Sequence, residues 1–270
     1  MPTMRQTIKA EITRNAPHPV HKLFAELIAV EPYPEVVIPV QKQIQHTSFF
    51  PGGIGLWRTL GSDLPLFPVG GVMVLGQDFD SVKGYEKSLE NAAENLTMPT
   101  WKNLQSLLER VNIQPETCFF TNIYIGLRQG TKNTGRFPGA AFVEFKARCS
   151  KFLLRQIAIQ KPGLILTLGT WVPRFLATLS PQLVAWSTGS FKDRDKDQDC
   201  EGSVRRDVTF DLEPFGLEPH RCVVASLVHP SLRGPNVHRR SWKTLSGDPA
   251  EIALLTEAYK CAFRSKVPTV

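Results

Sequence analysis

The chain has 270 residues, a length that suits one large α/β domain, and its apolar share is ordinary enough for a sizeable core. Its formal net charge of +7 favours an anionic partner such as nucleic acid, although many basic proteins bind none. No apolar run approaches the roughly 18 residues needed to cross a bilayer, and the first residues lack the apolar stretch of a signal peptide. We therefore expect an intracellular protein with no membrane contact.

The first quarter of the chain has little regular patterning. Residues 1–18 are polar and are expected to form a flexible arm. A helix is expected from Val20 to Val30, where apolar residues recur with helical spacing. The stretch that follows is rich in Pro and Gly but also in aromatic and aliphatic residues, which a free linker does not need. We interpret residues 19–67 as an ordered wrap on a single domain that spans residues 19–270.

Four short apolar runs are typical of buried parallel strands. Helical patterns separate them, so that strands and helices alternate along the chain. The sequence predicts an α/β fold with a central, mainly parallel four-stranded sheet and helices on both faces. The predicted strands are Val72–Leu75, Cys118–Ile123, Leu164–Leu168 and Cys222–Val228, and the predicted helices are Trp101–Val111, Phe142–Gln160, Trp171–Leu179 and Pro249–Phe263.

A segment of mixed charge, residues 187–211, interrupts this alternation before the last strand. Its centre reads FKDRDKDQDCEGSVRRD. Charged residues of both signs at such density are typical of a solvated surface. We expect a solvated insertion or a hairpin between the last two strands.

Polar residues follow three of the predicted strands at the point where each strand ends. Asp78 follows the first strand within GQDFDS, Asn122 ends the second within FFTNIYIGLR, and His229 follows the fourth within VHPSLRGP. In open α/β sheets, ligands bind beyond the carboxyl ends of the strands. We therefore expect a carboxylate, an amide and an imidazole to converge on one edge of the sheet.

These three motifs, in this order and each at a predicted strand end, resemble those of the uracil-DNA glycosylase superfamily. GQDFDS is similar to the first motif of its best-known branch, HPS matches its last motif, and the middle region with PGLILTLG looks closer to its thermophile-type branches. The resemblance covers about residues 70 to 245. It implies a monofunctional DNA glycosylase, which flips out a pyrimidine and hydrolyses its N-glycosidic bond to leave an abasic site.

The chemistry of such a reaction gives each residue a role. Positive charge develops on the sugar, where the carboxylate of Asp78 would stabilise it and activate a water molecule. Negative charge develops on the departing base, where a neutral imidazole at His229 would stabilise it. The carboxamide of Asn122 offers a donor and an acceptor to the edge of the base, without fixing which pyrimidine is bound. Further base-binding candidates are the backbone N–H groups of Gln77 and Asp78 and the aromatic rings of Phe79 and Tyr85.

Each of these residues also has an ordinary structural explanation. Asp78 alone would be a helix cap, Asn122 alone a turn residue at a strand end, and His229 alone a buried structural histidine. Their joint occurrence favours catalysis. Two other classes of function stay open: a catalytically weak DNA-binding module that recognises a modified base, and a hydrolase of free nucleotides.

An enzyme that flips a base must also grip the phosphate backbone and fill the vacated stack. Basic residues cluster beside two of the motifs, so we expect DNA, duplex or single-stranded, as the partner; solvated basic loops are the alternative. No obligatory protein partner is indicated. The candidate DNA-binding residues are Ser231, Leu232, Arg233, Arg239, Arg240 and Lys243 after the last strand, with Leu232 or Arg233 as the wedge, and Arg128, Lys132 and Arg136 after Asn122.

One departure from the superfamily bears on the substrate. The uracil-specific branch has a Tyr two positions after the catalytic Asp, where this chain has Asp80. A shorter, acidic side chain would open the pocket on that side and could accept a hydrogen bond from a hydroxylated substituent. A bulky 5-modified cytosine in bacteriophage DNA is therefore an alternative substrate, with a role in antiviral defence rather than in DNA repair.

A second departure bears on cofactors. The thermophile-type branches hold an iron–sulfur cluster with four Cys, whereas the five cysteines of this chain are dispersed and form no C-x-x-C pair. Cys149 stands where one ligand is expected, Gly126 stands at another such position, and no Cys precedes residue 118. We expect free thiols, no cluster, no metal and no other cofactor.

Overall fold

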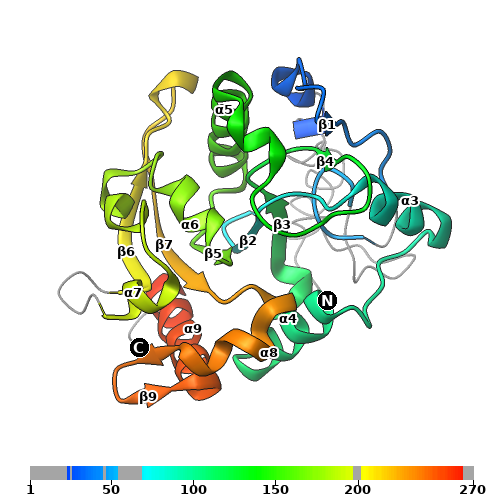
Figure 1. Ribbon diagram of the computed structural model, residues 1–270. Helices are drawn as coiled ribbons and strands as arrows, with labels where there is room; N and C mark the ends of the chain where they lie inside the picture. Colours follow the sequence, from blue (N-terminus) through cyan, green and yellow to red (C-terminus); the bar gives the residue numbers. More distant parts are fainter. Residues whose placement is uncertain (1–22, 25, 45–46, 54–68, 197–201, 264–270) are drawn as a thin grey trace, which may run out of the picture.

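The structure, a computed structural model, describes residues 23–24, 26–44, 47–53, 69–196 and 202–263. The predicted arm at residues 1–18, parts of the predicted wrap, and residues 20–22 and 25 of the helix expected from Val20 to Val30 lie outside the described residues. The centre of the molecule is a five-stranded sheet with the strand order β3-β2-β5-β7-β6 (Figure 1). Its strands are β2 (Val72–Gly76), β3 (Cys118–Asn122), β5 (Leu164–Leu168), β6 (Val204–Phe210) and β7 (His220–Leu227).

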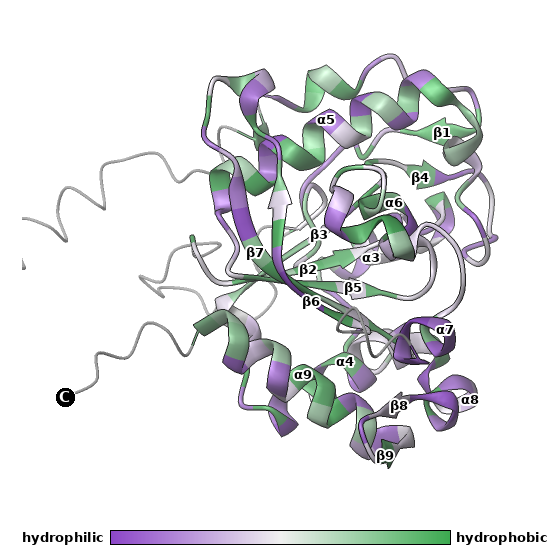
Figure 2. Cartoon of the chain, turned by 90° about the vertical axis from the view of Figure 1, so that its left-hand side faces the viewer, coloured by the Kyte–Doolittle hydropathy of each residue, from purple (hydrophilic) through white to green (hydrophobic). Residues whose placement is uncertain are grey.

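Alternate residues of the strands face two separate apolar cores. In β5, Ile165 belongs to the core that α5 (Val143–Gln160) and α6 (Trp171–Leu176) cover. Its neighbours Leu164 and Leu166 belong to the core beneath α4 (Pro99–Arg110) and α9 (Gly247–Phe263). Figure 2 shows these helix pairs on opposite faces of the sheet. A strand buried on both faces is mostly apolar, which is why the four predicted strands read as nearly continuous apolar runs, interrupted by buried residues such as Thr167 and Ser226.

The predicted α/β fold with a mainly parallel sheet is confirmed, and all four predicted strands are present with small shifts at their ends. Four of the five predicted helices are present, whereas the described end of the helix expected from Val20 to Val30 is a 3₁₀ turn at Glu26–Val30. Helix α3 (Val82–Asn91) was not expected, because only Tyr85 among its side chains is buried. The remaining helices are α7 (Phe191–Lys196) and α8 (Arg233–Asn236), with further 3₁₀ turns at Pro115–Thr117, Pro138–Ala141, Pro181–Trp186, Glu213–Phe215, Pro230–Leu232 and Val237–Arg239.

The prediction of four strands was wrong, because the charged segment supplies a fifth. β6 pairs antiparallel with β7. Of the two expected forms of this segment, a solvated insertion or a hairpin, the structure therefore shows a hairpin. Val204, Val208 and Phe210 are buried, but the charged residues between them hide the pattern of a strand. The pairing register also shifts between Arg205 and Val208, so no simple alternation exists to be recognised.

The described N-terminal residues pack along the outer edge of β3 and beyond it. Phe50 N donates a hydrogen bond to Phe120 O at 2.9 Å, which continues the sheet by one bridge. Further along, β1 (Val37–Ile38) pairs antiparallel with β4 (Leu127–Arg128), and β8 (Ser241–Trp242) pairs with β9 (Leu245–Ser246). The β1–β4 pair fixes the backbone of Arg128, which matters for the site below. None of the described helices has the length and apolar character needed to cross a membrane.

A buried ion pair holds α7 against the loop that follows the last strand of the sheet. Asp195 accepts hydrogen bonds from Ser203 Oγ at 2.5 Å and Ser241 N at 3.0 Å, and its Oδ2 lies 3.5 Å from Arg240 Nε. Arg240 also donates to Ser226 O in β7. Both charged side chains of the pair are fully buried. The charged segment is therefore anchored through its charges, and it is not solvated throughout.

We expect Asp195→Ala to lower the free energy of unfolding by about 3–5 kcal/mol, because removing one partner of a buried ion pair leaves the other charge uncompensated. Urea unfolding followed by circular dichroism measures this. The control is Glu144→Ala, which removes the 93% exposed partner of Arg148 and should leave stability nearly unchanged. Equal effects of the two substitutions would contradict the buried role of Asp195.

Candidate active site

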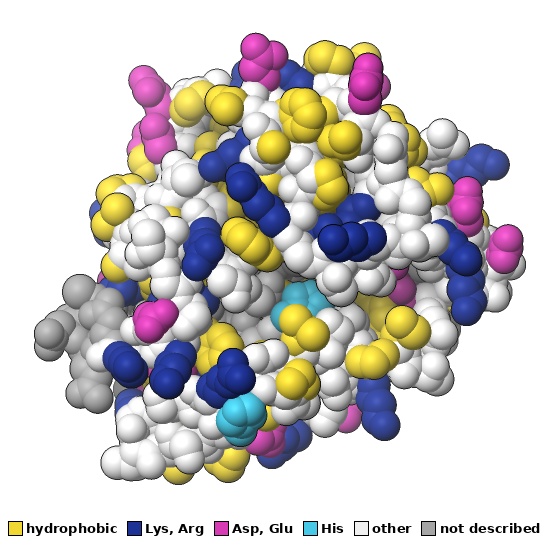
Figure 3. Space-filling model, in the orientation of Figure 1, with side chains coloured by type: hydrophobic (Ala, Val, Ile, Leu, Met, Phe, Trp, Pro, Cys, Tyr) yellow, Lys and Arg dark blue, Asp and Glu magenta, His cyan; other side chains and the backbone are white. Residues whose placement is uncertain are grey.

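The three motif residues lie at one edge of the sheet. In Figure 2 the parallel strands run toward the side that faces the viewer in Figure 1, so their carboxyl ends open onto that face. Asn122 ends β3, Asp78 follows β2 and His229 follows β7. β5 separates β2 from β7, and Gly169 follows it. Figure 3 shows this face as a hollow with a histidine inside and Lys and Arg side chains around it.

The side chain of Asn122 lies at this edge, and the residue is only 3% exposed. Gly76, its partner across the β2–β3 pair, approaches so closely that a Cβ at Gly76 would lie 2.3 Å from Asn122 Oδ1. A glycine is therefore required there for this orientation of the amide. Within the described part of the chain, no group forms a hydrogen bond with the Asn122 carboxamide. A carboxamide offers N–H donors and an acceptor oxygen, so this one is suited to pair with a bound molecule.

Asp78 forms a bidentate ion pair with Arg128. Arg128 Nε donates to Oδ1 at 3.0 Å and Nη2 donates to Oδ2 at 2.7 Å, and the side chains are only 4% and 7% exposed for Arg128 and Asp78. Burial raises the pKa of Asp78, and its hydrogen bonds and ion pair with Arg128 oppose that rise. A third hydrogen bond, from Asp80 N to Oδ1 at 3.3 Å, has the same opposing effect.

Asp78 is not the cap of the helix that follows it. Helix α3 is capped by Ser81, whose Oγ accepts a hydrogen bond from Gly84 N at 3.2 Å. Asp80 lies at the start of the same helix with φ 106°, and its Oδ1 accepts from Ser81 N at 2.6 Å. Positive φ at a residue other than glycine is strained, so the turn holds Asp80 in an uncommon conformation. The carboxylate of Asp80 is thereby engaged with the backbone of α3.

His229 is held as a neutral donor. Its Nδ1 accepts a hydrogen bond from Ser231 N at 3.3 Å and contacts Ser231 Oγ at 2.8 Å. Burial lowers the pKa of His229, because the charged imidazolium loses its solvation. With Nδ1 accepting, the proton of the neutral ring resides on Nε2, which is then a hydrogen-bond donor.

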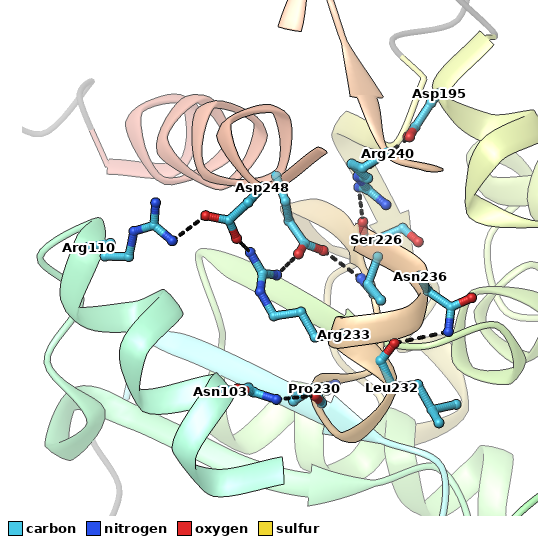
Figure 4. Close-up of polar contacts among 12 residues, drawn as sticks. Asn103, Arg110, Asp195, Ser226, Pro230, Leu232, Arg233, Asn236, Arg240 and Asp248 are labelled. Carbon is cyan, nitrogen blue, oxygen red and sulfur yellow. Dashed lines mark hydrogen bonds and ion pairs between the residues drawn. The ribbon is translucent and has the colours of Figure 1, made fainter. Parts of the chain in front are cut away.

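A network of ion pairs fixes the loop that carries His229 (Figure 4). Glu251 of α9 is completely buried; its Oε1 accepts from Val228 N at 2.6 Å and its Oε2 pairs with Arg233. Arg233 also pairs with Asp248, which in turn pairs with Arg110 of α4. The residues on both sides of His229 are thus tied to two helices on the same face of the sheet.

Two further hydrogen bonds complete this support. Asn103 Nδ2 of α4 donates to Pro230 O at 2.8 Å, and Asn236 Nδ2 donates to Leu232 O at 2.9 Å (Figure 4). The backbone from Val228 to Arg233 is therefore fixed, while the side chain of Leu232 is 50% exposed. An exposed apolar side chain on a rigid loop fits the predicted wedge.

The structure divides the predicted DNA-binding residues into two groups. Arg128, Arg233 and Arg240 are buried in the ion pairs described above, so their guanidinium groups are turned inward. The prediction failed to separate them from surface residues, because a basic residue next to a motif can pair internally. The exposed candidates are Ser231, Leu232, Lys132, Arg136, Arg239 and Lys243, of which Lys243 pairs with Glu257.

The predicted base-stacking residues are placed in a small apolar cluster. Tyr85 is buried there with Ile44, and its hydroxyl group donates to the backbone carbonyl of Lys42. Phe79 is half-buried against the same cluster. Gln77 donates from its side chain to Gly135 O at 3.0 Å, while its backbone N–H has no acceptor among the described residues. The structure therefore brings Gln77, but not the ring of Tyr85, to the open edge.

Sequence reasoning gave no role to the residues after β5. Gly169 has φ 81°, and a Cβ there would lie 3.2 Å from the Cβ of His229. A larger residue would be strained and would push against the imidazole. Trp171, two residues further on, is 36% exposed with Arg174 over its ring at 5.3 Å. A glycine directly after a buried strand was the signal for this part of the site.

The residues present do not fit an iron–sulfur cluster. The thiol of Cys149 lies in the apolar core, where burial raises its pKa to about 12. A Cβ at Gly126 would lie 2.4 Å from the side chain of Val37, so no cysteine fits at that position. The described residues also contain no group of three His, Cys, Asp or Glu side chains arranged to hold a metal ion.

Comparisons with protein-family models and with curated proteins found no match for this chain.

We expect the imidazole of His229 to titrate below its ordinary pKa of 6.5 and to carry its neutral proton on Nε2. Nitrogen-15 NMR of the histidine rings over a pH series measures both properties. Ser231→Ala should preserve the Nε2–H tautomer, because the backbone N–H of residue 231 still donates to Nδ1. A protonated Nδ1 at neutral pH would contradict the arrangement described here.

Proposed function

We propose that this protein is a monofunctional DNA glycosylase, which hydrolyses the N-glycosidic bond of a pyrimidine flipped out of DNA. The observation that carries the proposal is the convergence of Asp78, Asn122 and His229 at the carboxyl ends of three strands of one sheet. The resemblance of their motifs to the uracil-DNA glycosylase superfamily supports it. Each of the three side chains offers the group that one part of this reaction needs.

Asp78 would position and deprotonate the attacking water. A carboxylate has about four lone-pair sites, and hydrogen bonds from Arg128 and Asp80 occupy three of them. The site that remains is on Oδ2, where a water molecule can bind. The water oxygen forms a bond with C1′ of the sugar, the N-glycosidic bond breaks, and its electron pair leaves with the base. Asp78 takes the proton of the water.

His229 would stabilise the base as it leaves. The departing pyrimidine carries negative charge on its carbonyl oxygen, and the Nε2–H of a neutral imidazole donates a hydrogen bond to it. The loop around His229 is fixed by the network of Glu251, so the donor needs no rearrangement during the reaction. Preorganised donors of this kind are commonly worth about 2.7–4 kcal/mol of the barrier.

The base that is excised is either uracil or a 5-modified pyrimidine. The unpartnered carboxamide of Asn122 matches the hydrogen-bonding edge of a pyrimidine in either orientation. Asp80 stands where a tyrosine would limit the substituent at C5, and its carboxylate is bound to the start of α3. This favours an open pocket, and with it a bulky 5-modified cytosine of bacteriophage DNA and a role in antiviral defence.

A second candidate function is a DNA-binding module without turnover. The ion pair between Asp78 and Arg128 is the observation that favours it, because a carboxylate held by a guanidinium has a structural purpose of its own. The neutral donor at His229 favours the enzyme, since a binding module gains nothing from stabilising a leaving group.

We expect the protein to create alkali-sensitive abasic sites in oligonucleotides that carry one target base, and Asp78→Asn to lower this rate by at least about 100-fold while DNA is still bound. End-labelled strands with uracil, thymine opposite guanine, 5-hydroxymethylcytosine or its glucosylated form identify the base. Glu144→Gln, at an exposed position, is the control. DNA binding without any cleavage would refute the enzyme and support the binding module.

We also expect the exposed cations of this face to hold phosphates. Arg239→Ala and Lys132→Ala should each reduce the slope of log affinity against log salt concentration by about one, as loss of one phosphate contact does. Fluorescence anisotropy with a labelled oligonucleotide measures the slope. Lys260→Ala is the control, because the end of α9 lies against Gly163, at the opposite edge of the sheet. Equal slopes in all variants would contradict phosphate contacts at Arg239 and Lys132.

A further inference from the structure

The guanidinium group of Arg128 contacts the candidate catalytic carboxylate and a surface loop at the same time. We define residues 129–137 as the phosphate loop, because they include the exposed Lys132 and Arg136. Arg128 Nη1 donates to Thr134 O at 3.0 Å and to Arg136 O at 3.2 Å, and Nη2 donates to Gly135 O at 2.8 Å. With the two bonds to Asp78, all five N–H donors of the side chain are used.

The phosphate loop depends on this contact for its shape. Three consecutive carbonyl groups point at one guanidinium, and Gly135 O accepts a second hydrogen bond from the side chain of Gln77. At its end the buried ring of Phe137 lies 5.6 Å from the carbon at the centre of the guanidinium. The loop is therefore held from inside by Arg128 and by Gln77, the residue that directly precedes Asp78.

The dependence runs in both directions. If the phosphate loop moves away, Arg128 loses three of its five acceptors and is no longer held in the orientation that bonds Asp78. If Asp78 loses its charge, the guanidinium is left buried without a counter-charge, and its bonds to the loop weaken as well. A lysine cannot replace the arginine, because an ammonium group lacks the planar fork that bridges a carboxylate and a row of carbonyls.

We propose that Arg128 is a positioning residue that couples the phosphate loop to the Asp78 carboxylate, so that a DNA strand held by Lys132 and Arg136 fixes the orientation of that carboxylate. The part that concerns DNA rests on the proposed function. The coupling itself is a property of the protein alone and can be measured without a substrate.

Nitrogen-15 NMR relaxation tests the coupling in the free protein. Asp78→Asn and Arg128→Lys should each lower the backbone order parameters of residues 129–137 to below about 0.6, while those of α5 stay near the rigid value of about 0.85. The matched control is Arg155→Lys, which removes the Nε–H that is shared between both carboxylate oxygens of Glu26 and should leave the phosphate loop unchanged. If Asp78→Asn leaves the order parameters of this loop unchanged, the coupling is refuted, whether or not the protein is an enzyme.

Kinetics test the consequence for the reaction. Arg128→Lys should lower kcat about 100-fold, as a small misplacement of a catalytic group does, and should also raise KM because the phosphate loop loosens. Lys132→Ala leaves the contact between Arg128 and Asp78 in place and should mainly raise KM. Arg128→Gln should also move the acid limb of the kcat–pH profile to higher pH. The reason is that Arg128 opposes the rise in the pKa of Asp78, while burial and the negative charge of Asp80 promote it.

The two proposals fail in different ways. Absence of cleavage by the unmodified protein would refute the proposed function, and the relaxation experiment would still decide the coupling. Cleavage with an unchanged kcat and pH profile in the Arg128 variants would refute the positioning role and leave the proposed function standing. A purely structural role for Arg128 would lower the folded fraction of the variants, without moving the pH profile of the enzyme that remains folded.

Discussion

The buried ion pair between Asp78 and Arg128 is the contact on which the open edge of the sheet depends. Neither charge can be buried alone, because an isolated ion in the interior costs several kcal/mol. The β1–β4 pair, the turn at Asp80 and the 129–137 segment all meet at these two side chains. Described residues from the N-terminal quarter therefore help to shape the edge, through the pairing of Val37 and Ile38 with β4.

On the other side of the edge, a second set of ion pairs serves the same purpose. Glu251, Arg233 and Asp248 fix the loop of His229 in the way that Arg128 fixes Asp78. The charged side chains of these ion pairs thus stabilise the backbone. The groups that can bind a ligand are neutral, namely the amide of Asn122 and the imidazole of His229. These neutral donors lie next to the fixed carboxylate of Asp78. Because they need no rearrangement, such groups can stabilise charge that develops in a bound molecule during a reaction.

Much of this arrangement could be predicted from the sequence, and the remainder could not for physical reasons. Strands buried on both faces read as nearly continuous apolar runs, and the carboxyl ends of parallel strands share an edge, so Asp78, Asn122 and His229 could be placed together from the sequence. β6 was missed because Arg205 and its charged neighbours interrupt its apolar residues. Which arginines point inward was also not predictable. Arg128 pairs with Asp78 and Arg240 pairs with Asp195, both of them distant in the sequence. The residues that surround each arginine in the sequence do not indicate such a partner.

The ion pair also affects how Asp78 would act in the proposed mechanism. A guanidinium beside Asp78 weakens the field that the carboxylate exerts on a positively charged sugar, which taken alone would slow the reaction. The same guanidinium opposes the effect of burial on the pKa of Asp78, and so favours the ionised form that can accept a proton. A buried carboxylate without Arg128 would be a stronger base, but it would be protonated over a wider range of pH. The structure thus favours an ionised Asp78 in a fixed position over a more basic Asp78. This suits a carboxylate that orients water in a reaction in which the positive charge on the sugar forms early.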